Sequence, residues 1–552
     1  MAAKPTGTVT GLTRGGQIFH HYIKMLWEVT SKLFSFVFGL CFILFFVSLY
    51  MQTNKAEFFA FINYIQAWWV IDISEATGGN IFYISGWTDV QLLPALKTYQ
   101  HPVVFEYYNN FKNAAIWSAI ISTSSFFFIY IGAFFFLKWK GKDLNEEHHV
   151  RGSRLVDDES AKGIILNNAT KKEIGNLKIG DVPLLRAWEP QSFLCIGGPG
   201  SGKSVLTADW IEQARKENRK ALILDRSGGF IEKFYDPKKD IIINPYDKRT
   251  AKWSIFKECR ADYHYNFVAN TLIQKSDTES PFWPLAARLV FKSLLMKESA
   301  RDEPCMEHLM RTIMTCTLEQ MVDYCKGTDA ASVFDGEGMK MAQSIRSVIA
   351  SEVEILRVLD GKEADFSVRE WVEDEADGFI FISTLKDQEE ALRPFITLLC
   401  DIYMNSVLSL KPDLKRRIWS FLDELQALGK VTSLAPFLAE SRKYGGCCMA
   451  GFQGYSQAKR IYGDDGVEEL SDLFGTFIVL RCNGNKSADW SAKQLGKADN
   501  IEVNESLSYG VNSARDGANL QNSRRERDVV LASELQNLED LEGYVRFGRR
   551  MP

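Results

Sequence analysis

The sequence predicts an α/β protein with a doubly wound sheet, an all-α domain inserted in that sheet, and two N-terminal transmembrane helices. Short apolar runs bounded by turn residues predict buried strands, because a strand covered on both faces is continuously apolar. A long stretch with helical period separates these runs, and two uncharged segments near the N-terminus predict the membrane helices. The strand-forming runs are residues 193–196, 220–230, 378–384 and 474–482, and the apolar part of 416–430.

The composition indicates a multidomain chain of 552 residues. Charged residues at 24% and hydrophobic residues at 46% are typical of globular proteins, whereas 37 phenylalanines suggest segments surrounded by lipid. The net charge is about −5, from 65 basic and 70 acidic residues, which gives no general basic field for nucleic acid. Any contact with a polynucleotide is therefore expected to be local. The ten cysteines match no metal-site spacing and are expected to be reduced, buried thiols.

Residues 33–51 and 113–137 carry no charge and are each long enough to span a bilayer. The first run is too long for the core of a signal peptide and no small-residue cleavage site follows it. Lysines and arginines precede the first run and follow the second, which predicts that both ends face the cytoplasm. Residues 52–112 then form an external loop rich in aromatics. This loop either docks a partner or lies on the bilayer as an aromatic belt.

A complete phosphate-binding motif follows the first strand of the sheet. The pattern G-x-x-x-x-G-K-[ST] predicts a loop whose backbone N–H groups surround phosphates, with a lysine for the β- and γ-phosphates and a hydroxyl for magnesium. An apolar strand precedes the motif and a helical period follows it, which is the context that the motif requires. The predicted nucleotide-binding residues are Gly197, Gly198, Pro199, Gly200, Ser201, Gly202, Lys203 and Ser204.

Asp423 and Glu424 follow another apolar strand and supply the carboxylates that such a loop needs. Asp423 is predicted to hold the magnesium ion, and Glu424 to orient or deprotonate the attacking water. The alternative is an acidic pair at a helix N-terminus. In parallel sheets ligands bind at the carboxyl ends of the strands, so both motifs are expected to meet at one site.

Helical periodicity without strand signal predicts an all-α domain between the two motifs, which explains their separation by more than two hundred residues. The polar stretch after the second span is weakly patterned and predicts a linker. The expected organisation is a cytoplasmic N-terminal segment 1–32, transmembrane helix 33–51, periplasmic loop 52–112, transmembrane helix 113–137, linker and start of the cytosolic body 138–180, nucleotide-binding domain 181–261 and 376–552, and all-α domain 262–375.

Several phrases together resemble the type IV secretion coupling proteins, most closely those of the F-type conjugation systems. They occur in the same order and spacing across nearly the whole chain, and the helical insertion lies at the same place. The phrases are GGQI at 15–18, LDRSGGF at 224–230, YDPKKDIIINPYDKR at 235–249, ANTLIQ at 269–274, SPFWP at 280–284, FLDELQALGK at 421–430, ESRKYGG at 440–446 and GFQGYSQ at 451–457.

The resemblance implies a RecA-like P-loop ATPase that binds ATP and Mg²⁺. It implies a multi-pass protein of the bacterial inner membrane with most of its chain in the cytoplasm. It also implies a homohexamer that receives a relaxase bound to single-stranded DNA, as part of a relaxosome, and works with inner-membrane components of the secretion system. Carried over by position, Gln453 resembles the polar sensor after the next strand and Arg442 an arginine finger that reaches a neighbouring subunit. A strand-end hydrogen bonder and a solvated helix end are the respective alternatives.

Members of the F-type group carry a long tail after the ATPase domain for docking the relaxosome, whereas this sequence ends at Pro552, which puts docking by that route in doubt. Two other functions fit the same features. One is an ATPase that recruits protein effectors without pumping DNA, and the other is a docking platform switched by nucleotide binding. A complete Asp423–Glu424 pair argues against the pure switch, because a switch has less need of a carboxylate that activates water.

Overall fold

A computed structural model describes residues 8–77, 83–85, 92–94, 99–144, 148–274, 282–334, 338–358, 364, 366–508 and 517–548. The chain divides into two compact units. One contains residues 1–147 and 503–521, and the other contains residues 148–502 and 522–552.

Among the described residues up to 147, the first unit contains three helices and a small strand pair. They are α1 (Thr8–Gln52), α2 (Lys55–Thr77), β1 (Tyr83–Ser85), β2 (Leu92–Pro94) and α4 (Pro102–Leu144). Parts of the expected loop 52–112, residues 78–82, 86–91 and 95–98, lie outside the described residues. Where the loop is described it is largely helical, since α2 occupies its first half and α4 begins eleven residues before the uncharged run.

Among the described residues, two helices are long and apolar enough to cross a membrane, Leu26–Gln52 within α1 and Pro102–Lys140 within α4. Their large side chains face outward, with Phe36 exposed by 71% and Phe128 by 78%. Such exposure is unfavourable in water, and lipid removes the penalty. Small polar groups join the helices, since the Ser118 hydroxyl donates to Ser48 Oγ at 3.1 Å. Polar contacts of this kind are typical between helices in bilayers.

The second unit is organised by an eight-stranded sheet with the order β15-β12-β6-β11-β10-β7-β9-β8. All neighbouring strands are parallel except β15 and β12, which are antiparallel. The strands are β6 (Phe193–Ile196), β7 (Lys220–Asp225), β8 (Ile241–Ile243), β9 (Gly378–Ser383), β10 (Ile418–Leu422), β11 (Gly446–Phe452), β12 (Thr476–Leu480) and β15 (Gly543–Phe547).

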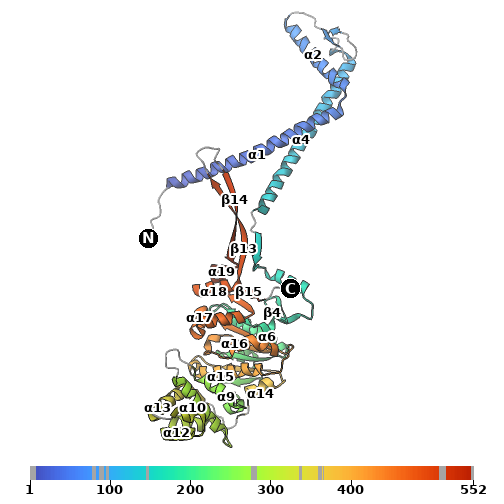
Figure 1. Ribbon diagram of the computed structural model, residues 1–552. Helices are drawn as coiled ribbons and strands as arrows, with labels where there is room; N and C mark the ends of the chain where they lie inside the picture. Colours follow the sequence, from blue (N-terminus) through green and yellow to red (C-terminus); the bar gives the residue numbers. More distant parts are fainter. Residues whose placement is uncertain are drawn as a thin grey trace. The chain divides into compact units, whose positions relative to one another are not determined.

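Successive residues of each central strand enter two different hydrophobic cores, which is why these strands have no polar face. In β10, Ile418 and Leu422 join one core while Trp419 and Phe421 join the other. Helix α6 (Lys203–Lys216) covers the second core through Trp210, which is fully buried. Helices α15 (Glu389–Leu408), α16 (Leu434–Glu440) and α17 (Tyr455–Leu473) contribute to the first core and lie one after another along the body (Figure 1).

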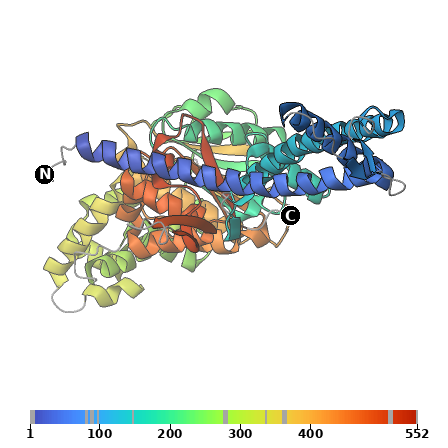
Figure 2. The same cartoon turned by 90° about the horizontal axis from the view of Figure 1, so that it is seen from above.

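The described residues from Asp262 to Glu373 are mainly helical, and one bridge joins Phe366 to Trp253. Helices α10, α12 and α13 gather at one end of this unit (Figure 1), and Figure 2 shows the same yellow and green helices apart from the orange ones. The elements are α9 (Asp262–Leu272), α10 (Phe282–Ser299), α11 (Met306–Thr315), α12 (Leu318–Cys325), η2 (Asp329–Phe334), α13 (Gly338–Val353), η3 (Glu354–Val358) and α14 (Val368–Glu373).

The stretch 138–180, expected as a linker and the start of the body, contains regular structure. It holds the end of α4, then β3 (His148–Gly152), α5 (Asp158–Asn168) and β4 (Ile174–Ile179). Strand β3 is polar and pairs antiparallel with β13, which lies about 350 positions later in the chain, so local pattern gave no indication of it. Residues 145–147 lie outside the described residues.

The remaining elements include a two-stranded and a three-stranded sheet, and residues 503–508 and 517–521 of the latter belong to the first unit. Strand β4 pairs antiparallel with β5, and β13 lies between β14 and β3 in a three-stranded sheet. They are β5 (Val182–Leu185), η1 (Glu189–Gln191), α7 (Gly229–Phe234), α8 (Ile255–Glu258), η4 (Leu425–Ala427), η5 (Ser441–Tyr444), α18 (Asn485–Leu495), β13 (Lys497–Ser508), β14 (Gly517–Asp528) and α19 (Ala532–Asn537).

Gly451 in β11 allows two strands to approach at the end of the sheet. A Cβ atom placed there would lie 2.1 Å from the backbone carbonyl oxygen of Asp423. We expect Gly451→Ala to lower the free energy of unfolding by about 1–3 kcal/mol, because β10 or β11 must move. Thermal unfolding of the full-length protein in lipid nanodiscs measures this effect.

Gly163→Ala in α5 is the matched control. Nothing lies within 4 Å of a Cβ atom at Gly163, and alanine favours a helix over glycine by up to about 1 kcal/mol. This variant should therefore be as stable as the wild type or more so. Equal stability of the Gly451→Ala and Gly163→Ala proteins would contradict the close approach of the strands.

Candidate functional site

The predicted phosphate-binding loop joins β6 to α6 at the carboxyl end of the sheet. Gly200 and Gly202 have φ angles of 77° and 103°, a region that favours glycine over residues with a Cβ atom. The loop therefore reverses tightly, and α6 begins at Lys203 with its N–H groups at the turn. Gly197, Gly198, Pro199, Gly200, Ser201 and Gly202 form this loop, and Lys203 and Ser204 begin the helix.

The Lys203 side chain is folded back into the loop. Its Nζ donates to the carbonyl oxygens of Gly197 at 2.5 Å and of Gly198 at 3.1 Å. Burial lowers the pKa of Lys203, because the charged amine has lost water. An anion in the loop would offer this cation a stronger partner than two neutral carbonyls. The loop thus combines a cation, a helix N-terminus and flexible glycines, which is an anion-binding arrangement.

Asp423 lies at the end of β10 and is held by α6. The Ser204 hydroxyl donates to Asp423 Oδ2 at 2.6 Å, and the Thr207 hydroxyl donates to Oδ1 at 2.7 Å. The structure therefore brings together residues that are 219 and 216 positions apart. The motif did not predict Thr207, although its spacing of three from Ser204 places both on one face of the helix.

Glu424 is surrounded by hydrogen-bond donors. Its Oε1 accepts from Gln426 Nε2 at 2.5 Å and from Gln453 Nε2, and Arg226 forms an ion pair with its Oε2. Gln453 reaches Glu424 because it follows β11, the neighbour of β10 in the sheet. Arg226 follows β7, the neighbour on the other side. No motif indicated a role for Gln426 or Arg226, although Arg226 lies in LDRSGGF, one of the phrases that resemble coupling proteins.

Arg442 is not brought to this site within its own chain. It lies in η5 before β11, whereas Gln453 follows that strand. The seven residues of β11 place its two ends about 20 Å apart. Arg442 is exposed, and its guanidinium has no ion pair or hydrogen bond within the part of the chain that the structure describes.

The segment before β15 covers one side of the loop. The Leu541 N–H donates to the Ser201 carbonyl at 3.2 Å, and Asp540 pairs with Arg481 at 2.7 Å. The Arg481 carbonyl in turn accepts from the Gly198 N–H at 2.7 Å. No motif in the sequence indicated these contacts, because the residues lie more than 270 positions beyond the loop in the chain.

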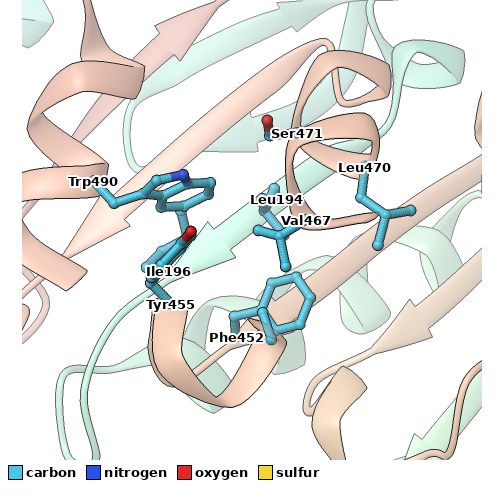
Figure 3. Close-up of a pocket in the computed structure, with 9 residues that line it drawn as sticks. Leu194, Ile196, Phe452, Tyr455, Val467, Leu470, Ser471 and Trp490 are labelled. Atoms are coloured by element: carbon cyan, nitrogen blue, oxygen red, sulfur yellow. The ribbon is translucent and has the colours of Figure 1, made fainter. Parts of the chain in front are cut away.

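A small apolar cavity of about 10 Å³ lies in the hydrophobic core beside Ile196, the last residue before the loop. Figure 3 shows Phe452, Tyr455 and Trp490 around it, with Val467 and Leu470 from α17. None of its lining residues is charged. This volume holds at most about one water molecule, so the cavity is a packing gap and not a ligand site.

Comparison with known proteins identifies the same architecture. Residues 176–552 match the family model of the type IV secretion-system coupling protein DNA-binding domain. The coupling protein TraD of Escherichia coli (strain K12) is 30% identical over 549 residues, which are 97% of this chain and 75% of that protein.

Solved structures of the plasmid coupling protein TrwB are also similar. The unbound monoclinic form of TrwBΔN70 is 31% identical with a TM-score of 0.65, covering 73% of this chain and 92% of that one. TrwB in complex with ADP and Mg²⁺ is 31% identical with a TM-score of 0.64, covering 73% and 91%. The complex with the ATP analogue ADPNP is 30% identical with a TM-score of 0.64, covering 73% and 92%.

These matches confirm the predicted fold class, a RecA-like P-loop ATPase fold with a doubly wound sheet, inserted helices and two apolar N-terminal helices. The family match extends over more than half of the chain, and the relative from Escherichia coli matches it almost from end to end. The chain therefore belongs to the coupling proteins of type IV secretion systems.

Proposed function

We propose that this protein is an inner-membrane coupling ATPase of a conjugative type IV secretion system. It uses ATP hydrolysis to deliver relaxase-bound single-stranded DNA to the transfer channel. The observation that carries the proposal is the convergence of Lys203, Ser204, Asp423, Glu424 and Gln453 at the carboxyl end of one sheet. A chain that only bound nucleotide would not need Glu424 in this place.

The loop suits a nucleotide polyphosphate. The backbone of residues 197–202 and the start of α6 receive the phosphates, and Lys203 leaves its carbonyl partners to contact the β- and γ-phosphates. The TrwB complexes with ADP and ADPNP support this assignment, because they occur on a similar fold at 30–31% identity. The positive φ angles at Gly200 and Gly202 let the backbone follow the phosphates closely.

The donor set also suits Mg²⁺. Ser204 and Asp423 present a hydroxyl and a carboxylate 2.6 Å apart, and hard oxygen ligands of this kind are those that Mg²⁺ prefers. Thr207 orients Asp423 through the other carboxylate oxygen, Oδ1. When bound, Mg²⁺ neutralises charge on the β- and γ-phosphate oxygens during transfer. TrwB in complex with ADP and Mg²⁺ supports the fit.

Glu424 is the general base in the proposed reaction. A water attacks the γ-phosphorus, the bond to the ADP oxygen breaks, and the proton of the water passes to Glu424. Gln453 orients the Glu424 carboxylate through its side-chain amide. Arg442 contributes charge to the γ-phosphate of a neighbouring subunit, which agrees with its exposure and its distance from the site of its own chain.

The membrane and DNA parts of the proposal rest on the family and on the two apolar helices. Helices α1 and α4 anchor a multi-pass protein with both ends in the cytoplasm. The second unit forms a homohexamer around the single-stranded DNA. The family description names a DNA-binding domain over residues 176–552. The relaxase and the inner-membrane components of the secretion system are the proposed protein partners.

We expect single-stranded DNA to raise the ATP hydrolysis rate of the full-length protein in lipid nanodiscs several-fold. Lys203→Ala should abolish hydrolysis, with a loss of about 10²-fold or more, because the phosphates lose their cation. Lys216→Ala, at the exposed far end of the same helix, is the control and should keep the wild-type rate. A rate that no DNA changes but a secreted protein raises would favour recruitment of protein effectors instead.

Arg442→Ala should reduce hydrolysis by on the order of 10³-fold if Arg442 is a finger that acts between subunits. Arg442→Ala subunits keep their phosphate loop, and Lys203→Ala subunits keep their finger. In rings mixed at random from equal amounts, about a quarter of the sites combine an intact loop with an intact finger from the neighbouring subunit. Such rings should therefore regain up to about a quarter of the wild-type rate. A mixture as inactive as its two parents would contradict the role in trans. Lys443→Ala, the exposed neighbour, should be active without mixing.

A further inference from the structure

Arg226 links the proposed general base to a second carboxylate. Its NH1 pairs with Glu424 Oε2, and its NH2 pairs with Glu389 Oε2. The three side chains are exposed by only 20%, 18% and 14%, so water screens the contacts weakly. One guanidinium is thus shared between two carboxylates that come from different elements, the end of β10 and the start of α15.

Three donors hold the Glu424 side chain in this structure. Two amide groups donate hydrogen bonds to Oε1, and Arg226 forms an ion pair with Oε2, so each oxygen already has a protein partner. A general base needs an oxygen within hydrogen-bond reach of the water that it deprotonates. Arg226 is the one charged donor among the three, and its positive charge opposes the transfer of a proton to Glu424, so the base is freed to act when Arg226 moves away.

Glu389 makes the release of Glu424 possible. A partly buried guanidinium that lost every carboxylate partner would keep an uncompensated charge, whereas Arg226 keeps Glu389 when Glu424 leaves. Burial alone would raise the pKa of Glu389, but hydrogen bonds from Arg226 and Lys386 outweigh it and lower the pKa. Glu389 is therefore ionised at neutral pH and ready to hold the cation alone. Lys386 Nζ also pairs with Glu389, at 3.0 Å.

We propose that Arg226 is a positioning residue that clamps Glu424 in the resting state, and that Glu389 takes over its guanidinium when Glu424 turns toward the attacking water. This inference rests on the proposed ATPase function. Because Glu389 begins α15, a small shift of that helix changes how strongly it competes for Arg226. Helix α15 packs against α9 and α14 at the two ends of the helical insertion, so the insertion has a physical route to the base.

The test compares the full-length wild type with Arg226→Gln, Glu389→Gln and the double variant, all in lipid nanodiscs without DNA. Arg226→Gln should raise kcat for ATP hydrolysis about 3- to 10-fold and leave KM within about twofold, because Glu424 is released while the phosphate loop is intact. Glu389→Gln should lower kcat by a similar factor, since Arg226 then has only Glu424 to hold. The double variant should behave like Arg226→Gln, because the clamp is gone in both.

Lys386→Gln is the matched control, because it removes the exposed partner of Glu389 and leaves Arg226 in place. Its kcat should stay within about twofold of the wild type. A lower kcat for Arg226→Gln would overturn the clamp. A double variant whose kcat shows the sum of the two single effects, instead of the effect of Arg226→Gln alone, would also overturn it. Should thermal unfolding show that Arg226→Gln does not fold, Glu389→Gln decides alone, and an unchanged or higher kcat for it overturns the inference. A wild type without any ATP hydrolysis would instead refute the proposed function.

Discussion

The hydrogen bonds from α6 to Asp423 are the contacts on which the site depends. Ser204 and Thr207 reach one carboxylate across an intervening strand, since β11 lies between β6 and β10 in the sheet. Such a reach is possible because parallel strands direct their carboxyl ends to a single edge. Gly451 contributes by leaving out a Cβ atom where the two strands meet at Asp423. The sheet order and one missing side chain thus place the magnesium ligands proposed above.

The charges beside this centre are arranged for change and not for permanent stability. Glu424 accepts from two amides and one guanidinium, and Lys203 is satisfied by two backbone carbonyls. Each of these side chains is held by protein partners, and in the proposed reaction each exchanges at least one of them. In the proposed reaction, substrate binding changes these contacts, so hydrolysis would wait for a conformational change.

Burial follows opposite rules in the two units. In the body, alternate residues of each central strand enter two cores, so apolar side chains are hidden from water on both faces of the sheet. In α1 and α4, phenylalanines face outward and small polar groups lie between the helices. The first arrangement hides apolar groups from water, and the second suits the bilayer proposed above. The division agrees with two kinds of solvent for one chain.

The sequence alone determined those features that short-range spacing encodes. The loop at 197–204 is specified by fixed positions within eight residues, Asp423 and Glu424 by a strand that ends beside them, and the apolar helices by uncharged runs. Only the tertiary structure decided which distant residues meet these motifs. Arg226 reaches the site through strand order and Leu541 through the return of the chain, and β3 pairs with a strand about 350 positions away. Local patterns report which face of an element is apolar, whereas these contacts depend on which elements become neighbours.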